Sequence, residues 1–376
     1  MNTSAHVSRR IYGRPDDTRY SDMKSLKADA RYSKDNHEVL ESDWGDLRVK
    51  AVVQDNEDKY ILQVRNNTPI ELPLNSFALT QMCRLARLRK TDLPRLDLET
   101  RQEFFDQLLY DSVIDKDFDP TKQKAKILIE NQHDGQAVVR AVVSQAYERV
   151  WDIDLLDIVD RWAIGSGFKP AVPTINQWIQ EKDGGKPALF RSDRDMYTFF
   201  YTDRDNGSNQ DFGGLRKGLV VMNSEVGASS LVIDEFIFRE VCGNFLIWGM
   251  TQREVRMKPH IGEIQLFVDQ FEQELKVKSG TIEITQLEWD RIEKASKKQF
   301  ARTPEEANTR LRKMLDLTVE QALRSVALAQ NSEAGAGDLS FWSVANGVTA
   351  TAKEQPFADQ QIELSRKAGK LLNAVA

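Results

Sequence analysis

The chain has 376 residues, of which 40% are hydrophobic and 29% are charged, a composition typical of an ordinary globular protein. No apolar run approaches the roughly 18 residues of a membrane helix, and the N-terminus lacks a signal-peptide apolar region, so we expect a cytoplasmic protein. The net charge of −6 argues against a generally basic nucleic-acid coat, and two cysteines are too few for a disulfide framework.

Residues 1–45 mix charges of both signs with few apolar residues, which predicts a flexible or loosely docked arm. Ordered structure is expected to start near Asp46, where the runs LRVKAVV and KYILQV predict a β-hairpin around a polar turn. A helix over FALTQMCRLARLRK follows, with Asn75 or Ser76 as its cap. A second helix is predicted over residues 99–110.

The middle of the chain predicts further strand pairs. KAKILIE and AVVRAVVS flank NQHDGQ, whose Asp-Gly pair is a strong hairpin signal. A helix is predicted to begin near Asp152 or Asp154, and YTFFYT at residues 197–202 returns to the sheet. Two β-rich runs within Gly218–Gly249, broken by Ser224–Ser230, indicate a hairpin that leads into a short helix.

Residues 276–376 are predicted to be helical. Thr285 and Glu288 fit a capping box, in which the two side chains satisfy free backbone donors reciprocally. Beyond Thr303, apolar residues at the spacing of one helical face predict one long helix to about Gln330. Two further helices are predicted at Phe341 to Lys353 and Ala358 to Ala374.

Together these elements predict an α+β fold with a mixed or antiparallel sheet core, flanking helices and a helical C-terminal part. The sheet core is expected within residues 46–275, between the arm and the helical region of residues 276–376. The sequence contains no internal repeat, so a repeat architecture is excluded.

Polar residues follow both runs of the hairpin after Gly218, where a purely structural strand pair would not need them. Asn223 and Glu225 end the first run, and Arg239 follows the second. We expect these side chains to gather at one end of the sheet and to order a binding groove or a subunit interface. The predicted polar cluster is Asn223, Glu225, Arg239, Asn244 and His260.

Two arginines lie in or after apolar strands. Burying an arginine is costly unless a carboxylate or a phosphate pairs with it. Glu225 is the predicted partner of Arg239, and Asp152 or Asp154 is the predicted partner of Arg140. A structural ion pair is the alternative to phosphate binding at both positions.

A basic cluster follows residue 83 on the predicted helix. Arg84, Arg87 and Lys90 recur every three residues, Arg89 is adjacent, and no acid occurs before Asp92. Such a stripe can bind a phosphate backbone electrostatically. A solvated helix face explains any single cluster equally well.

Other residues extend this predicted nucleic-acid interface. Arg140, Tyr147 and Arg149 are expected near the bound strand. Aromatic side chains beside the sheet could stack bases, namely Tyr147, Trp151, Tyr197 or Phe200. Two further basic clusters lie within residues 291–313 and at Arg256 with Lys258.

Motifs of known chemistry are absent from the sequence. KDGGKP and IGSGFKP lack the spacing of a phosphate-binding loop, so ATP hydrolysis is not expected. His260 and Glu263 could lie one helical turn apart, but they lack further ligands at metal-like spacing. Cys242 has no histidine nearby in the sequence to serve as its base. We therefore expect no catalytic residue, no cofactor and no metal site.

Four segments carry a family resemblance: RAVVSQAYERVWDIDLL (140–156), SDRDMYTF (192–199), GLVVMNSEVGASSLVIDEFIFREVCGN (218–244) and WSVANGVTATAK (342–353). From about Leu72 the chain resembles the phage/plasmid-like family catalogued as domain of unknown function nine-three-two, which occurs in bacteriophages, prophages and plasmids. NSEVG and R-x-V-C-x-N are the most specific segments, while Gln145 stands where the family more often has an acidic residue. The resemblance implies a mobile-element protein acting in the host cytoplasm.

The leading hypothesis is a mobile-element protein that binds single-stranded DNA, as an annealing or recombination-mediator protein that needs no ATP and works as a homo-oligomer. A first alternative is a counter-defence or assembly protein that binds phage or host proteins. A second alternative is an enzyme whose site is built from Asn223, Glu225, Arg239 and His260.

Overall fold

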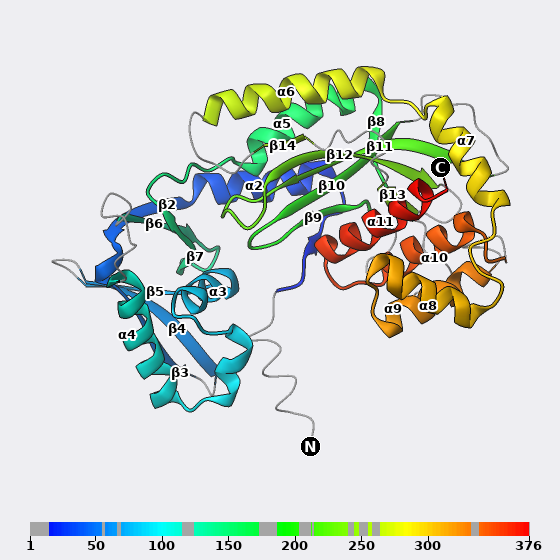
Figure 1. The fold of residues 1–376 in the computed structure, drawn as a ribbon. Coiled ribbons are helices and arrows are strands. Elements are labelled where there is room, and N and C mark those ends of the chain that lie inside the picture. The colour runs from blue at the N-terminus through cyan, green and yellow to red at the C-terminus, as the bar shows by residue number, and fades with distance from the viewer. Residues whose placement is uncertain are drawn as a thin grey trace.

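A computed structural model describes the backbone over most of the chain. The described residues are 15–54, 57–65, 69–114, 124–172, 186–202, 212, 214–239, 244–247, 255–257, 264–331 and 338–375. They form an N-terminal unit, a central sheet with helices on both faces, and a C-terminal group of helices (Figure 1). The predicted α+β class with a helical C-terminal part is confirmed.

The N-terminal unit packs two small antiparallel sheets against two helices. Its strands are β3 (Leu47–Gln54), β4 (Glu57–Val64) and β5 (Ile70–Pro73) in one sheet, and β2 (His37–Asp43), β6 (Lys124–Asn131) and β7 (Ala137–Ser144) in the other. Helices α3 (Ser76–Leu85) and α4 (Leu98–Ile114) share one apolar core with both sheets. The two predicted hairpins are confirmed as β3–β4 and β6–β7.

The central sheet is antiparallel and follows the order β1-β9-β10-β11-β12-β13, with β8 on β10 and β14 on β12. Its strands are β1 (Thr18–Arg19), β8 (Phe168–Pro170), β9 (Leu189–Arg191), β10 (Met196–Thr202), β11 (Leu215–Asn223), β12 (Leu231–Arg239), β13 (Asn244–Ile247) and β14 (Val255–Met257). Alternate residues of β11 face opposite cores, since Leu219 and Val221 belong to one and Val220 and Met222 to the other. The sheet is therefore covered on both faces.

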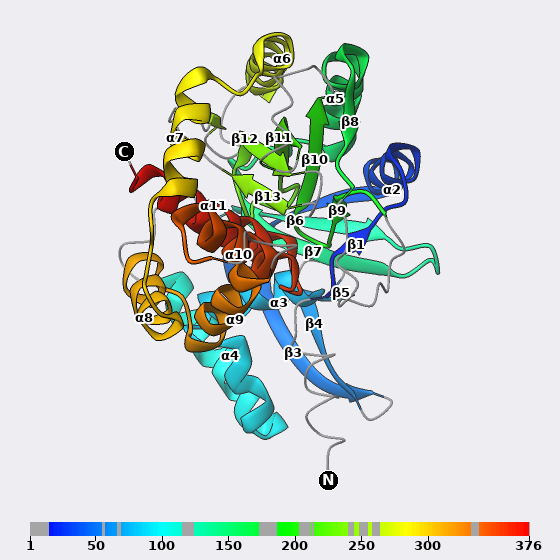
Figure 2. The same cartoon turned by 90° about the vertical axis from the view of Figure 1, so that its right-hand side faces the viewer.

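Helices from distant parts of the sequence cover these two faces. On one side lie α2 (Met23–Asp35), α5 (Asp152–Trp162) and α6 (Ile264–Thr281), and on the other lies α11 (Ala358–Asn373). Figure 2 shows α2, α5 and α6 along one side of the sheet. Buried positions of α2 and α6 meet those of α5 in a single core.

The predicted start of ordered structure near Asp46 is wrong. Residues 15–43 contain β1, α2 and β2, and α2 buries Leu26 and Ala30 against α5. The charges that resembled a flexible arm are complementary to acids on α5: Lys34 Nζ lies 2.6 Å from Asp154 Oδ1. A helix with few apolar residues is stable here because it is paired with an oppositely charged surface.

The short helix expected after the second run of the central hairpin is also wrong where the structure describes it. Residues 244–247 form β13, which pairs with β12 in antiparallel register. The β-favouring residues Phe245 and Leu246 extend the sheet by one more strand.

The C-terminal group consists of α7 (Gln286–Lys297), α8 (Pro304–Leu315), α9 (Val319–Gln330) and α10 (Phe341–Lys353), joined by α11. The predicted capping box of Thr285 and Glu288 is confirmed by both of its hydrogen bonds. The single long helix predicted to Gln330 is wrong, because Asp316 adopts a left-handed conformation with φ 50° and Thr318 caps a new helix. The apolar spacing continues across this break, which is why the sequence suggested one helix.

Candidate functional site

A cluster of buried charges joins the N-terminal unit to the central sheet. Glu225, which is 1% exposed, lies in the turn between β11 and β12. Its Oε2 is 2.9 Å from Arg140 Nη1 and 3.1 Å from Arg191 Nη2, and its Oε1 accepts from the backbone N–H of Asp152 at 3.0 Å. Because Arg140 belongs to β7 and Arg191 to β9, one carboxylate connects two sheets.

Further carboxylates complete the pairing of both arginines. Asp152 Oδ2 accepts from Arg191 Nε at 2.9 Å, while its Oδ1 accepts from the amide of Asn223 at 2.8 Å. The outer partners are Glu130, 2.9 Å from Arg140, and Asp29, 2.6 Å from Arg191. Each guanidinium therefore contacts several carboxylates, as burial of an arginine requires.

Burial and neighbouring charges shift the pKa values of the two innermost carboxylates, Asp152 and Glu225, in opposite directions. Desolvation, followed by the negative charge of Glu225, raises the pKa of Asp152 to about 7. Desolvation alone would raise the pKa of Glu225 as well, but Arg191 and Arg140 outweigh it and hold the pKa below its usual range. Glu225 is thus the permanent anion of the cluster, and Asp152 is held closer to its neutral form.

The predicted partners of the strand arginines are wrong. Arg140 pairs with Glu225 and Glu130 rather than with Asp152 or Asp154. Arg239 donates from Nε to the backbone carbonyl of Phe212 at 2.9 Å, and Glu225 lies at the other end of the hairpin.

The predicted polar cluster is divided between the two ends of β11 and β12. Asn223 ends β11, whereas Arg239 pairs with Leu215 at its beginning, so these two positions are about 27 Å apart at 3.4 Å per residue. Asn244 pairs with Arg239 at that far end. In an antiparallel meander, successive turns lie at opposite ends of the sheet. Residues that follow two successive strands are therefore far apart. His260 lies outside the described residues, as do Glu263 and Cys242.

Tyr147 and Arg149 are structural rather than exposed for stacking. Tyr147 is 8% exposed, and its ring packs on Gly227, where a Cβ would lie 3.0 Å away. The Arg149 guanidinium lies 4.3 Å from the ring of Trp151, and burial lowers its pKa to about 10. Its Nη1 and Nη2 have no hydrogen-bond partner among the described residues. The predicted base-stacking residues Tyr197 and Phe200 are also buried, at 5% and 0% exposed.

The basic cluster of residues 84–90 lies where α3 ends. The helix stops at Leu85, five residues before the predicted end, and Arg87 takes a left-handed conformation with φ 54°. The backbone N–H of Leu88 then donates to the carbonyl of Cys83 at 2.8 Å, which closes the helix end. Arg84, Arg87 and Arg89 are exposed around this turn, so they form a compact group instead of a straight stripe.

The side chain of Lys90 contacts the start of α3. Lys90 begins a short 3-10 helix, η2 (Lys90–Arg95), and its Nζ donates to the backbone carbonyl and hydroxyl of Ser76 at 3.1 and 2.6 Å. Desolvation lowers the pKa of Lys90 to about 8, and Asp193 and Arg194 are close enough to influence it. The cluster therefore adjoins the connection between β9 and β10.

The second basic cluster, in residues 291–313, is not on the same surface. It belongs to α7 and α8, which Figure 1 places on the opposite side of the molecule from α3. Arg310 is occupied there, since its guanidinium lies 4.6 Å from the ring of Phe300 and 5.3 Å from that of Phe341. The side chains of Arg256 and Lys258 lie outside the described residues.

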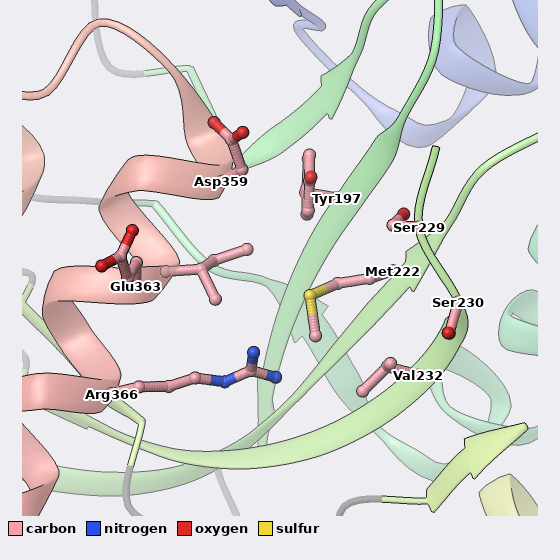
Figure 3. Close-up of a pocket in the computed structure, with 9 residues that line it drawn as sticks. Tyr197, Met222, Ser229, Ser230, Val232, Asp359, Glu363 and Arg366 are labelled. Carbon is pink, nitrogen blue, oxygen red and sulfur yellow. The ribbon is translucent and has the colours of Figure 1, made fainter. Parts of the chain in front are cut away.

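A cavity of about 260 Å³ lies between α11 and the central sheet, beside the turn that carries Glu225 (Figure 3). Strand residues form one side, and charged residues of α11 form the other. Neither this cavity nor the role of Arg191 was predicted from the sequence. Arg191 ends the apolar run LFR, so it could have been recognised as a buried arginine in the same way as Arg140. Polar residues spaced along one face of α11 could have indicated the cavity.

Comparison with known proteins identifies no relative of this chain. No family model, no curated protein and no solved structure matches it. The resemblance to the phage/plasmid-like family stays a prediction. None of the helices in the described part of the chain combines the length and apolar character needed to cross a bilayer. Within the same residues, no three His, Cys, Asp or Glu side chains are grouped as metal ligands.

Proposed function

We propose that this chain binds single-stranded nucleic acid through Arg84, Arg87, Arg89 and Arg95, which are called the basic surface below. The observation that carries the proposal is local charge, because this stretch holds these arginines and Lys90 against one acid, Asp92. Arg89 and Arg95 have 87% and 81% of their side chains exposed and lie 3.9 and 3.7 Å from Asp92. Exposed ion pairs contribute little, so the surface keeps its capacity to bind phosphates.

The manner of binding follows from which side chains are accessible. Tyr147 and Phe200 are in the core, so they are not available to stack bases. Contacts of the basic surface with phosphates carry no sequence information, and they weaken with salt. This behaviour suits a protein that gathers single strands for annealing or recombination without ATP.

The buried charges support this role indirectly. The basic surface lies on the N-terminal unit, and Arg140 with Glu225 connects that unit to the central sheet. We assign the cluster a positioning role, since Glu225 is too buried to touch a ligand. The enzyme alternative loses its support, because Asn223 and Glu225 lie at the end of the hairpin opposite to Arg239.

The cellular setting remains part of the proposal. The resemblance to the phage/plasmid-like family supports a mobile-element protein in the host cytoplasm, where single-stranded intermediates arise. Annealing requires that several chains hold two strands, so we propose a homo-oligomer. A phage or host protein partner is the alternative, and it would replace nucleic acid as the ligand of the basic surface.

Charge reversal of Arg84→Glu with Arg87→Glu is expected to weaken binding of a single-stranded oligonucleotide by at least about tenfold, because two phosphate contacts become repulsive. The measurement is fluorescence anisotropy of a labelled oligonucleotide. The matched control is Arg312→Glu with Lys313→Glu, an equal charge change at exposed positions on α8. Equal losses in both variants would show a response to net charge and would refute the assigned surface.

The affinity for the oligonucleotide is also expected to fall by about two- to fivefold between pH 7 and pH 9. This factor corresponds to the energy of one exposed ion pair. Lys90 has a pKa of about 8, so its positive charge is lost over this interval. Lys90→Arg keeps its charge and should bind equally at both pH values. Anisotropy titrations at constant ionic strength test this, and an identical pH dependence in the variant would exclude Lys90 from the interface.

A further inference from the structure

Neither the buried charges nor the basic surface accounts for the cavity between α11 and the central sheet. Its volume is about 260 Å³, smaller than the roughly 300–1,000 Å³ of pockets for drug-sized ligands. Figure 3 shows Arg366 of α11 directed toward Met222 and Val232 across this space. The cavity therefore has room for one small planar group.

The floor of the cavity is a row of apolar side chains from three adjacent strands. Tyr197 on β10 is the register partner of Met222 on β11, which in turn partners Val232 on β12. All three are less than 8% exposed. An aromatic ring beside a polarisable thioether is a favourable surface for a flat, weakly polar ring.

The opposite wall is one face of α11, formed at the spacing i, i+3, i+4, i+7 by Asp359, Ile362, Glu363 and Arg366. Ile362 is 3% exposed and continues the apolar surface, while the other three are charged. The third side is the β11–β12 turn, which contributes the hydroxyls of Ser229 and Ser230.

The charged groups of this wall keep acceptor capacity although each has a partner. Asp359 Oδ2 lies 3.4 Å from Arg194 Nη2, and its Oδ1 accepts from the backbone N–H of Gln360 at 2.9 Å. Glu363 Oε1 lies 2.9 Å from Lys367 Nζ. A carboxylate has about four acceptor positions, so the ion pair of Glu363 with Lys367 leaves others for a ligand. Arg366 forms an ion pair with Asp234 at 3.1 Å, and this carboxylate neutralises the charge of the one guanidinium among the lining residues. The wall is therefore richer in acceptors than in unengaged donors.

We infer that the cavity binds a single nucleobase that carries an exocyclic amine. The ring would lie on Tyr197 and Met222, and the amine would donate to Glu363. Carboxylates accepting from the amine of cytosine are an established mode of base recognition. The choice of a nucleobase among planar amines rests on the proposed function.

The position of the cavity fits a strand held by the basic surface. Arg194 contacts Asp359, which lines the cavity, and the positive charge of Arg194 is close enough to Lys90 to lower the pKa of Lys90. Ser229 donates to Asp195 at 2.8 Å, so the turn and the β9–β10 connection are joined beside the cavity. A phosphate backbone that passes Lys90 and Arg194 would bring one base to the opening.

The test compares deoxycytidine with deoxyuridine, which differ in the amine or carbonyl at C4, by isothermal titration calorimetry on the full chain. Deoxycytidine is expected to bind about tenfold more tightly, the value of one good base-specific contact. Asp359→Ala with Glu363→Ala should abolish this difference, and both positions are exposed enough to tolerate alanine. The control, Glu320→Ala on α9, should keep it.

Nucleosides carry no phosphate, so their binding tests the cavity independently of the basic surface and of the proposed function. Arg84→Glu with Arg87→Glu should leave deoxycytidine binding unchanged. Binding of deoxycytidine without oligonucleotide binding would support the cavity and refute the basic surface. Absence of deoxycytidine binding at about 10 mM, a concentration that detects even weak sites, or equal binding of both nucleosides would overturn the inference.

Discussion

Replacing Glu225 by glutamine is expected to lower the free energy of unfolding by about 3 kcal/mol or more, the usual result of removing one partner from a buried ion pair. The variant keeps the shape of the side chain but removes the anion between Arg140 and Arg191. Both arginines have 6% of their side chains exposed, so water cannot replace the lost charge. Urea unfolding followed by circular dichroism measures the loss.

Ionisation of Asp152 limits this loss without cancelling it. In the wild-type protein, desolvation and the charge of Glu225 raise the pKa of Asp152, so removing Glu225 lowers this pKa and strengthens the existing pair of Asp152 with Arg191. Arg140 then retains Glu130 alone among the carboxylates of the cluster described above. The control is Glu148→Gln, which removes the exposed pair with Lys126 and should cost less than about 1 kcal/mol. A similar cost for both variants would contradict the assignment of Glu225 as the central anion.

Replacing Gly347 by alanine is expected to destabilise the C-terminal helices by about 3 kcal/mol, at the upper end of the usual cost of overpacking. A Cβ at this position would lie 2.1 Å from the backbone carbonyl oxygen of Ser325 and 3.0 Å from the Cβ of Ala329. Because the first contact is with backbone, α9 and α10 must move apart to relieve it. Thermal and urea unfolding of the variant measure the cost.

The matched control is Gly280→Ala on α6, where a Cβ would meet nothing within 4 Å. This substitution should stabilise the protein by up to about 1 kcal/mol, because alanine has the higher helix propensity. The two changes are chemically identical, so opposite signs would isolate the close approach of α9 and α10. If Gly347→Ala were neutral, the helices would not be packed as closely as described.

Local features of the fold could be predicted because neighbouring residues determine them. The β6–β7 hairpin follows from alternating apolar residues and from Gly135, which adopts φ 81° in the turn. The cap at Thr285 follows from a hydroxyl and a carboxylate three residues apart. The break at Asp316 was missed because the apolar spacing continues through it.

Charge partners could not be predicted because they depend on tertiary structure. Arg140 was correctly singled out as an arginine within an apolar strand, yet its partner Glu225 is 85 residues away in the sequence. Arg239 and Glu225 follow successive strands of an antiparallel meander, so they lie at opposite ends of the hairpin. Pairing across such distances follows from strand order, which the sequence pattern did not determine.

The residues predicted for the nucleic-acid interface differ in exposure, because the exposure of some of them depends on tertiary structure. Arg84, Arg87 and Arg89 are exposed as expected, because a run of arginines has few ways to be buried. Tyr197 and Phe200 are core residues, because helices cover both faces of the sheet in which β10 lies. Sequence alternation alone does not distinguish a strand covered on both faces from one with an open face.

The salt dependence of single-strand binding tests the central claim most directly. Anisotropy of a labelled single-stranded oligonucleotide would be measured over a range of salt concentrations with the wild-type chain. Binding through the four arginines of the basic surface predicts that log K falls against log salt with a slope of about −3, since each phosphate contact on a single strand contributes about −0.7. Absence of binding at low salt, or binding that does not change with salt, would contradict the account.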